Sequence, residues 1–133
     1  MTQEEKQLLL KDLCARIPYG VIVELRGTYE DGEKYIRDAE FDGPMLSYLY
    51  YDETSIKPYL RPMSSMTEEE KKEYSNAHVL DNCDELANIQ KYGNKYIQLA
   101  RTHAHDYLVS HQFDYRGLIE MGLALEAPEG MYE

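Results

Sequence analysis

The chain has 133 residues, of which 43% are hydrophobic and 29% are charged, and both fractions are typical of a globular protein rather than a disordered one. Its formal net charge of -11 argues against binding to DNA or RNA and against anionic membrane surfaces. The chain has only two cysteines and no apolar run of the ~20 residues that span a bilayer, so we expect a cytoplasmic protein with reduced thiols and no membrane segment.

The first predicted element is a helix at the N-terminus. Thr2 and Glu5 have the spacing of a capping box, in which each side chain bonds the backbone N–H of the other residue. Leu9 and Leu13 recur at helical spacing and give the helix one apolar face. Pro18 cannot continue a helix, so we expect it to end there.

A β-hairpin is predicted next. Along residues 21–26, Val21, Val23 and Leu25 face one side of a strand and Ile22, Glu24 and Arg26 face the other, so we expect Glu24 to face outwards. Asp31 and Gly32 predict a two-residue hairpin turn, because both central positions of that turn need a positive φ. The return strand then spans residues 34–41.

Two further strands are predicted after the hairpin. The aromatic content of residues 45–51 favours a third strand, and residues 55–60 form a fourth. Pro58 and Pro62 make this last strand an edge strand or a short piece, because proline has no N–H for the ladder. Four short strands with tight turns indicate an antiparallel meander, either as an SH3-like barrel or as a flat sheet with a helix packed on it.

Helices are predicted in the second half of the chain. Two overlapping capping boxes that begin at Ser65 and Thr67 predict a helix over residues 67–78. Helical spacing predicts another over residues 94–110, and Asp114 is expected to cap a third, short helix.

The fold class is therefore α+β: an N-terminal helix, a small four-stranded antiparallel meander, and two or three C-terminal helices. We expect one compact domain over residues 1–133, with sub-lobes at 1–63 and 64–133.

Three stretches of the sequence resemble a family of small uncharacterised proteins of gut anaerobic bacteria, which are often associated with prophages or mobile elements. The stretches are MTQEEKQLLLKDLCARIPYG (Met1–Gly20), IKPYLRPMSSMTEEEKKEY (Ile56–Tyr74) and FDYRGLIEMGLALEAPEGMY (Phe113–Tyr132). The resemblance implies no activity, and it therefore assigns no catalytic residue.

A cluster of titratable side chains, His103, His105 and Asp106, is the weak candidate for a metal site. On a helix, however, His103 and His105 point about 200° apart and cannot share one ion. We therefore expect histidines at a helix surface or an interface, with no metal and no cofactor.

Tyrosine is unusually frequent, with 13 tyrosines against two phenylalanines and no tryptophan. Tyr48, Tyr50, Tyr51 and Tyr59 fall on neighbouring predicted strands with Arg61 close by, and exposed rings of this kind anchor protein interfaces. The alternative is that Tyr48 and Tyr50 share the buried face of the sheet.

The sequence lacks a nucleophile elbow, a P-loop and a dinucleotide-binding glycine pattern. We therefore expect a non-catalytic accessory or interaction protein that acts through a protein partner or as a homo-oligomer. The alternatives are an acidic mimic of nucleic acid that inhibits a DNA-binding protein and a hydrolase with an unrecognised site.

Overall fold

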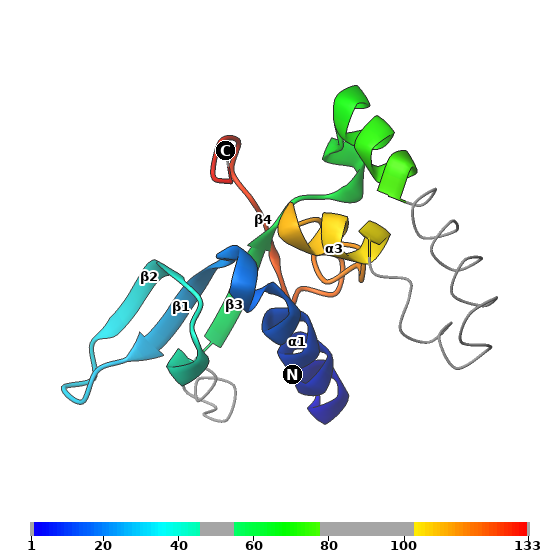
Figure 1. Cartoon of the computed structure of the whole chain (residues 1–133). Coiled ribbons are helices and arrows are strands. Elements are labelled where there is room, and N and C mark those ends of the chain that lie inside the picture. The colour runs from blue at the N-terminus through cyan, green and yellow to red at the C-terminus, as the bar shows by residue number, and fades with distance from the viewer. Residues whose placement is uncertain (1, 46–54, 78–102, 133) are drawn as a thin grey trace.

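The computed structural model describes residues 2–45, 55–77 and 103–132 (Figure 1). The described residues form an α+β structure with an N-terminal helix, a four-stranded sheet and further helices. No helix within these residues is long and apolar enough to cross a bilayer.

Helix α1 (Gln3–Arg16) begins and ends where the sequence predicts. The Thr2 hydroxyl accepts a hydrogen bond from the N–H of Glu5 at 3.1 Å, which confirms the N-cap. A short 3₁₀ turn, Ile17–Tyr19, follows the helix. Gly20 then takes a left-handed conformation with φ 72°, which glycine adopts at little cost.

The sheet is mixed, so the prediction of a purely antiparallel meander was wrong. Its strands are β1 (Ile22–Thr28), β2 (Lys34–Glu40), β3 (Ser55–Leu60) and β4 (Leu125–Glu126). Strands β1 and β2 form the predicted hairpin, and β1 also pairs antiparallel with β3, whereas β4 pairs parallel with β3. The strand order is β2-β1-β3-β4, and the SH3-like closure stays a prediction.

The turn of the hairpin differs from the predicted two-residue type. The N–H of Tyr29 donates to the C=O of Glu33 at 2.7 Å, and this bond encloses a loop of three residues, 30–32. Gly32 has φ 90°, but Asp31 does not have a positive φ. A three-residue loop needs only one left-handed residue, and Gly32 supplies it.

Strand β3 is internal and has six residues, although Pro58 and Pro62 predicted an edge strand or a short piece. Pro58 lies opposite Val23 on β1, and Val23 directs its own N–H and C=O towards β2. The β1–β3 ladder therefore needs no N–H from Pro58. Of the predicted third strand, only Met45 is described, at the end of a short 3₁₀ turn, and residues 46–51 lie outside the described residues.

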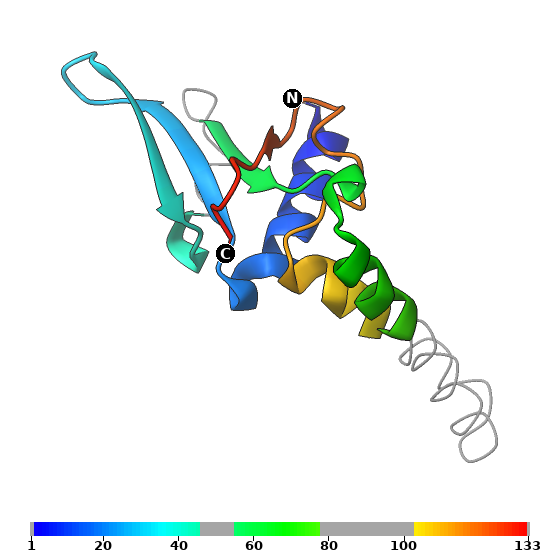
Figure 2. The same ribbon diagram turned by 90° about the horizontal axis from the view of Figure 1, so that it is seen from above.

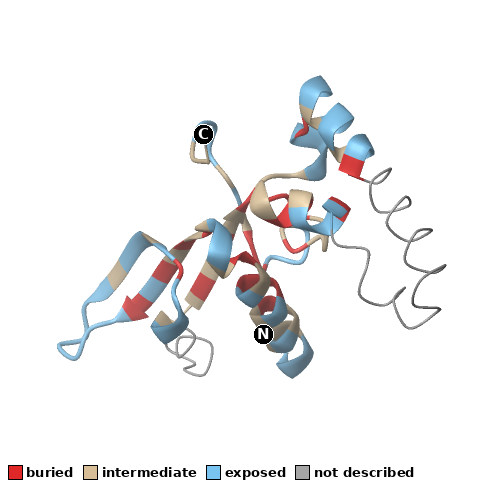
Figure 3. Ribbon diagram, in the orientation of Figure 1, coloured by how far each residue is buried: buried red, intermediate tan, exposed pale blue. Residues whose placement is uncertain are grey.

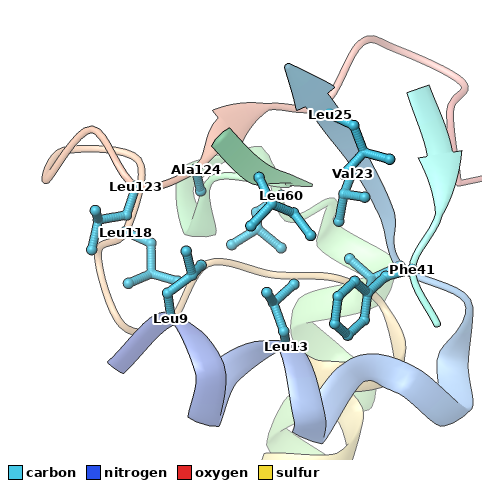
Figure 4. Close-up of a cluster of buried hydrophobic side chains, with 11 residues drawn as sticks. Leu9, Leu13, Val23, Leu25, Phe41, Leu60, Leu118, Leu123 and Ala124 are labelled. Atoms are coloured by element: carbon cyan, nitrogen blue, oxygen red, sulfur yellow. The ribbon is translucent and has the colours of Figure 1, made fainter. Parts of the chain in front are cut away.

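The main hydrophobic core lies between α1 and the inner face of the sheet (Figure 4). Leu9 and Leu13 point from α1 towards side chains of β1 and β3, as the helical spacing predicts. Leu118 and Leu123, from the C-terminal segment, complete the same cluster. The core therefore joins residues from both sides of the expected boundary between residues 63 and 64.

The helix at residues 68–77 begins with one of the two predicted capping boxes. The N–H of Thr67 donates to Glu70, and the N–H of Glu70 donates to the Thr67 hydroxyl at 3.2 Å. Ser65 instead closes the 3₁₀ turn Met63–Ser65 by donating to the C=O of Pro62.

Helix α3 (His103–Ser110) ends at the predicted residue, and residues 94–102 of the expected helix lie outside the described residues. A short helix was expected after Asp114, but the chain forms turns there. The buried Asp114 carboxylate accepts hydrogen bonds from the N–H groups of Leu118 and Ile119 at 2.8 and 3.0 Å. These side-chain bonds stabilise turns in place of a helix.

Candidate interaction surface

The β1–β2 hairpin projects from the body of the molecule, away from α1 and α3 (Figures 1 and 2). Most residues of β2 are exposed, whereas β1 alternates between buried and exposed positions (Figure 3). The hairpin is therefore the most open part of the described sheet.

Strand β2 forms one edge of the sheet, and its hydrogen-bonding phase is fixed at both ends. The N–H of Phe41 donates to the C=O of Val21 at 2.8 Å, and Tyr29 donates to Glu33. Because hydrogen bonding alternates along an antiparallel strand, the odd-numbered residues of β2 direct their backbone N–H and C=O groups towards β1. The even-numbered residues of β2 direct their backbone N–H and C=O groups away from β1. Within the described residues, no strand pairs with this side of β2. The even-numbered residues are Lys34, Ile36, Asp38 and Glu40.

Ile36 is an apolar side chain in the middle of this edge. Its side chain lies on the outer face of the sheet, opposite α1, and the residue is 62% exposed. An isolated exposed isoleucine is ordinary on a protein surface. A strand edge that no described strand pairs with, and that carries an exposed isoleucine, can accept an added strand.

The inner face of the hairpin carries aromatic and cationic side chains near its tip. The ring of Tyr35 lies across Gly27, where an added Cβ would come within 3.0 Å of it. Tyr29 packs against Tyr35 with the ring centroids 4.8 Å apart, and the Arg37 guanidinium lies 5.9 Å from the Tyr35 centroid. Gly27 thus makes room for a ring that stiffens this end of the hairpin.

Tyr59, one of the predicted platform residues, lies on the outer face of β3 and contacts the hairpin. Its hydroxyl is 2.9 Å from a carboxylate oxygen of Asp38 and 3.3 Å from one of Glu24. Burial and the neighbouring Asp38 carboxylate raise the pKa of Tyr59 above its usual value. Arg26 pairs with Glu24 at 2.6 Å on the same face.

Arg61, the other described platform residue, makes separate contacts. Its guanidinium donates two hydrogen bonds to Glu70, at 2.8 and 2.7 Å, and lies 4.2 Å from the centroid of the Phe113 ring. Hydrogen bonding to Arg61 lowers the pKa of Glu70 to about 2. Arg61 therefore joins β3 to the 68–77 helix.

The remaining platform residues, Tyr48, Tyr50 and Tyr51, lie outside the described residues, so the platform stays a prediction. The described part of it does not form one continuous surface, because Tyr59 and Arg61 engage different partners.

The three weak metal candidates are placed in two different surroundings. Nε2 of His105 is 2.9 Å from the hydroxyl of Tyr115. His103 and Asp106 instead line an open hollow of about 380 Å³ with Glu73. Among the described residues, no group of three His, Cys, Asp or Glu side chains is arranged to hold a metal ion.

A larger cavity, of about 630 Å³, lies between the Arg61–Glu70 pair and residues 126–132. Arg61 and Glu70 neutralise each other's charge in this pair. The hydroxyl of Tyr132, also in its lining, donates to the C=O of Tyr59 at 2.6 Å and accepts from the N–H of Ile22 at 3.0 Å. The Tyr132 hydroxyl therefore holds the C-terminal segment against the sheet.

Comparisons with protein-family models, with curated proteins and with solved structures found no match. The resemblance to the family from gut anaerobes therefore stays a prediction.

Sequence reasoning did not single out the β2 edge. The signal in the sequence was the alternation within residues 34–41, which puts Ile36 in phase with Lys34 and Asp38 on the polar face. An apolar residue on the solvent side of a strand bears on strand addition only where that strand lies at an edge of the sheet, and the local sequence pattern does not show which strand lies there.

Proposed function

We propose that the protein is a non-catalytic interaction protein whose β2 edge pairs with a strand of a partner. The observation that carries the proposal is the outward-facing backbone of β2 with Ile36 exposed at its centre. In strand addition, backbone hydrogen bonds provide affinity, and side chains at alternate positions select the partner.

The projection of the hairpin supports this mode of binding. An added strand needs access to the edge, and helices α1 and α3 lie on the other side of β1 and β3 (Figure 2). The contact between Tyr35 and Gly27 and the outer-face contact between Tyr59 and Asp38 hold the edge in an extended conformation before a partner arrives. Preorganisation of this kind lowers the entropic cost of binding.

The two alternatives have less support. A mimic of nucleic acid needs a continuous acidic stripe, whereas the outer face of the hairpin also carries bases, such as Arg26 in its pair with Glu24. A hydrolase that uses the predicted cluster would need His105 beside His103 and Asp106, and His105 contacts Tyr115 instead.

The test is a comparative pull-down from the native host with the tagged protein and two variants. Ile36→Lys places a charge at the centre of the edge, and we expect it to lose the partner. Met121→Lys makes the same change in charge at a residue that is 48% exposed on the segment after α3, and it should retain the partner. Equal recovery by both variants, or a monomer with no partner at all, would count against the proposal.

A further inference from the structure

We infer that the strand that β2 accepts is β2 of a second copy, paired antiparallel about a two-fold axis at Ile36. This inference rests on the proposed function and names its partner. Two copies joined in this way form one continuous eight-stranded sheet with the two hairpins side by side at its centre.

The hydrogen-bonding phase of β2 permits this arrangement. An antiparallel pair forms when the residues that direct their backbone groups outwards lie opposite one another. With the axis at Ile36, Ile36 lies opposite Ile36 of the second copy, and Lys34 lies opposite Asp38 of the second copy. All of these residues direct their backbone groups away from β1.

The side chains are complementary in the same register. On the outer face, Lys34 meets Asp38 of the second copy twice, once on each side of the axis, and the two Ile36 side chains cover each other at the centre. On the inner face, Tyr35 lies opposite Arg37 of the second copy, which places a guanidinium beside an aromatic ring. The order of residue types from Lys34 to Asp38 is therefore self-complementary about Ile36.

Neighbouring registers are less complementary. An axis at Arg37 pairs Lys34 with Glu40 of the second copy, but it sets Arg37 opposite its own copy and puts Ile36 opposite Asp38, so that like charges meet and an apolar side chain faces a carboxylate. An axis at Tyr35 puts Lys34 opposite Ile36 and Asp38 opposite Gly32, so both Lys34–Asp38 pairs are lost. Of these three registers, only the axis at Ile36 combines ion pairs on the outer face with a contact between the two Ile36 side chains.

The predicted interface is small, because only the five residues from Lys34 to Asp38 of each copy face each other in it. Interfaces that bury less than about 1,200 Å² belong to weak or transient complexes. We therefore expect a monomer–dimer equilibrium that depends on protein concentration.

Disulfide cross-linking tests the position of the axis. Both native cysteines, Cys14 and Cys83, are replaced by serine, and Ile36→Cys is introduced. Cα atoms of a hydrogen-bonded pair are about 5.5 Å apart, within the range of a disulfide, so mild oxidation should give a covalent dimer. The matched control is Arg37→Cys in the same background, because the two Cα atoms at residue 37 would lie about 7–8 Å apart diagonally across the axis, which is too far.

Charge exchange tests the predicted ion pairs. Lys34→Asp and Asp38→Lys each place two like charges opposite one another at both symmetry-related positions, and each should raise the dimer Kd about tenfold or more. The double variant restores opposite charges and should return the Kd to within about threefold of the original value. Sedimentation velocity over a range of concentrations measures the Kd, and far-UV circular dichroism checks that each variant is folded.

The outcomes separate this inference from the proposed function. Cross-linking at residue 37 that equals or exceeds that at residue 36, or no rescue by the double variant, overturns the register. A strict monomer without cross-linking, combined with a pulled-down partner that Ile36→Lys loses, overturns self-pairing and leaves strand addition standing. A partner that Ile36→Lys retains, together with a strict monomer, overturns both.

Discussion

Two clusters of charged side chains in this molecule have similar chemistry and opposite surroundings. The outer face of the hairpin holds Arg26 and Glu24 in contact at 2.6 Å, and the Arg26 side chain is 55% exposed. The junction of α1 with the C-terminal segment holds Arg16 and Asp12 in contact at 2.9 Å, and both side chains are 0% exposed. Because of this difference in burial, we expect the first cluster to form part of an accessible surface and the second to stabilise the fold.

The buried junction is fully hydrogen-bonded. Besides Asp12, the Arg16 guanidinium donates to the backbone C=O of Phe113 at 2.6 Å and to Gln112 at 3.4 Å. Arg116 approaches the same Asp12 carboxylate at 3.2 Å. Charges removed from water cost several kcal/mol unless they are paired and bonded in this way, so each member depends on the others.

The largest effect is expected for Arg16→Met, which removes the guanidinium and leaves Arg116 as the cation that pairs with the buried Asp12 carboxylate among the described residues. Because the loss of one partner of a buried ion pair exposes the other to an apolar environment, we expect a destabilisation of about 3–5 kcal/mol. Urea denaturation at pH 7 measures it. Lys11→Met, at an exposed residue of the same helix, is the control and should change stability by less than about 0.5 kcal/mol.

That junction also marks where sequence reasoning failed. The spacing of Asp12 and Arg16 is i,i+4, which on one sequence is indistinguishable from an ordinary pair on a helix surface. The Asp12–Arg16 pair is buried because residues 112–116 pack against α1. Contacts between residues about 100 positions apart produce no local pattern in the sequence.

The elements that sequence reasoning predicted correctly have local causes. The cap at Thr2 and the alternation along β1 each depend on residues within a few positions of one another. By contrast, β4 has only two residues, too few for a recognisable alternation, so neither its parallel pairing nor the internal position of β3 was foreseen. The exposure of Ile36 was missed for a related reason, since it depends on which strand lies at the edge.

Glu70→Gln should produce the second largest effect and extends the comparison to a pair of intermediate burial. The folded pKa of Glu70, about 2, lies below the usual value of 4.5, so the pair with Arg61 stabilises the protein above pH 4.5 and loses this contribution as the pH falls towards 2. We expect the variant to lose about 2 kcal/mol at pH 7 and little at pH 2.

Urea denaturation at several pH values measures this difference. Glu68→Gln is the matched control, because Glu68 pairs with Lys71 on the same helix but its side chain is 88% exposed. It should change stability by less than about 0.5 kcal/mol at either pH. A difference between Glu70→Gln and the original protein that does not shrink at low pH would show that the ion pair is not its cause.

Tyr132→Phe should reduce the stability by less, because it removes hydrogen bonds between uncharged groups. The hydroxyl bridges Ile22 and Tyr59, the next pair along the β1–β3 register after Val23 and Pro58, so it takes the place of a ladder hydrogen bond. Its removal leaves a partly buried N–H and C=O without this partner, and we expect a loss of about 1–2 kcal/mol in thermal denaturation. An unchanged stability would mean that water replaces the hydroxyl.

The smallest effect is expected for Arg26→Met, which makes in the exposed cluster the substitution that Arg16→Met makes in the buried one. The Arg26 guanidinium is largely hydrated, and Glu24 keeps the Tyr59 hydroxyl within hydrogen-bond distance after the change. We therefore expect a loss of less than about 0.5 kcal/mol at pH 7, which should disappear at high salt because ions screen an exposed pair. A loss as large as that of Arg16→Met would show that pairing rather than burial sets the energy, and the hairpin face would then be part of the stabilising framework and not a surface kept free for a partner.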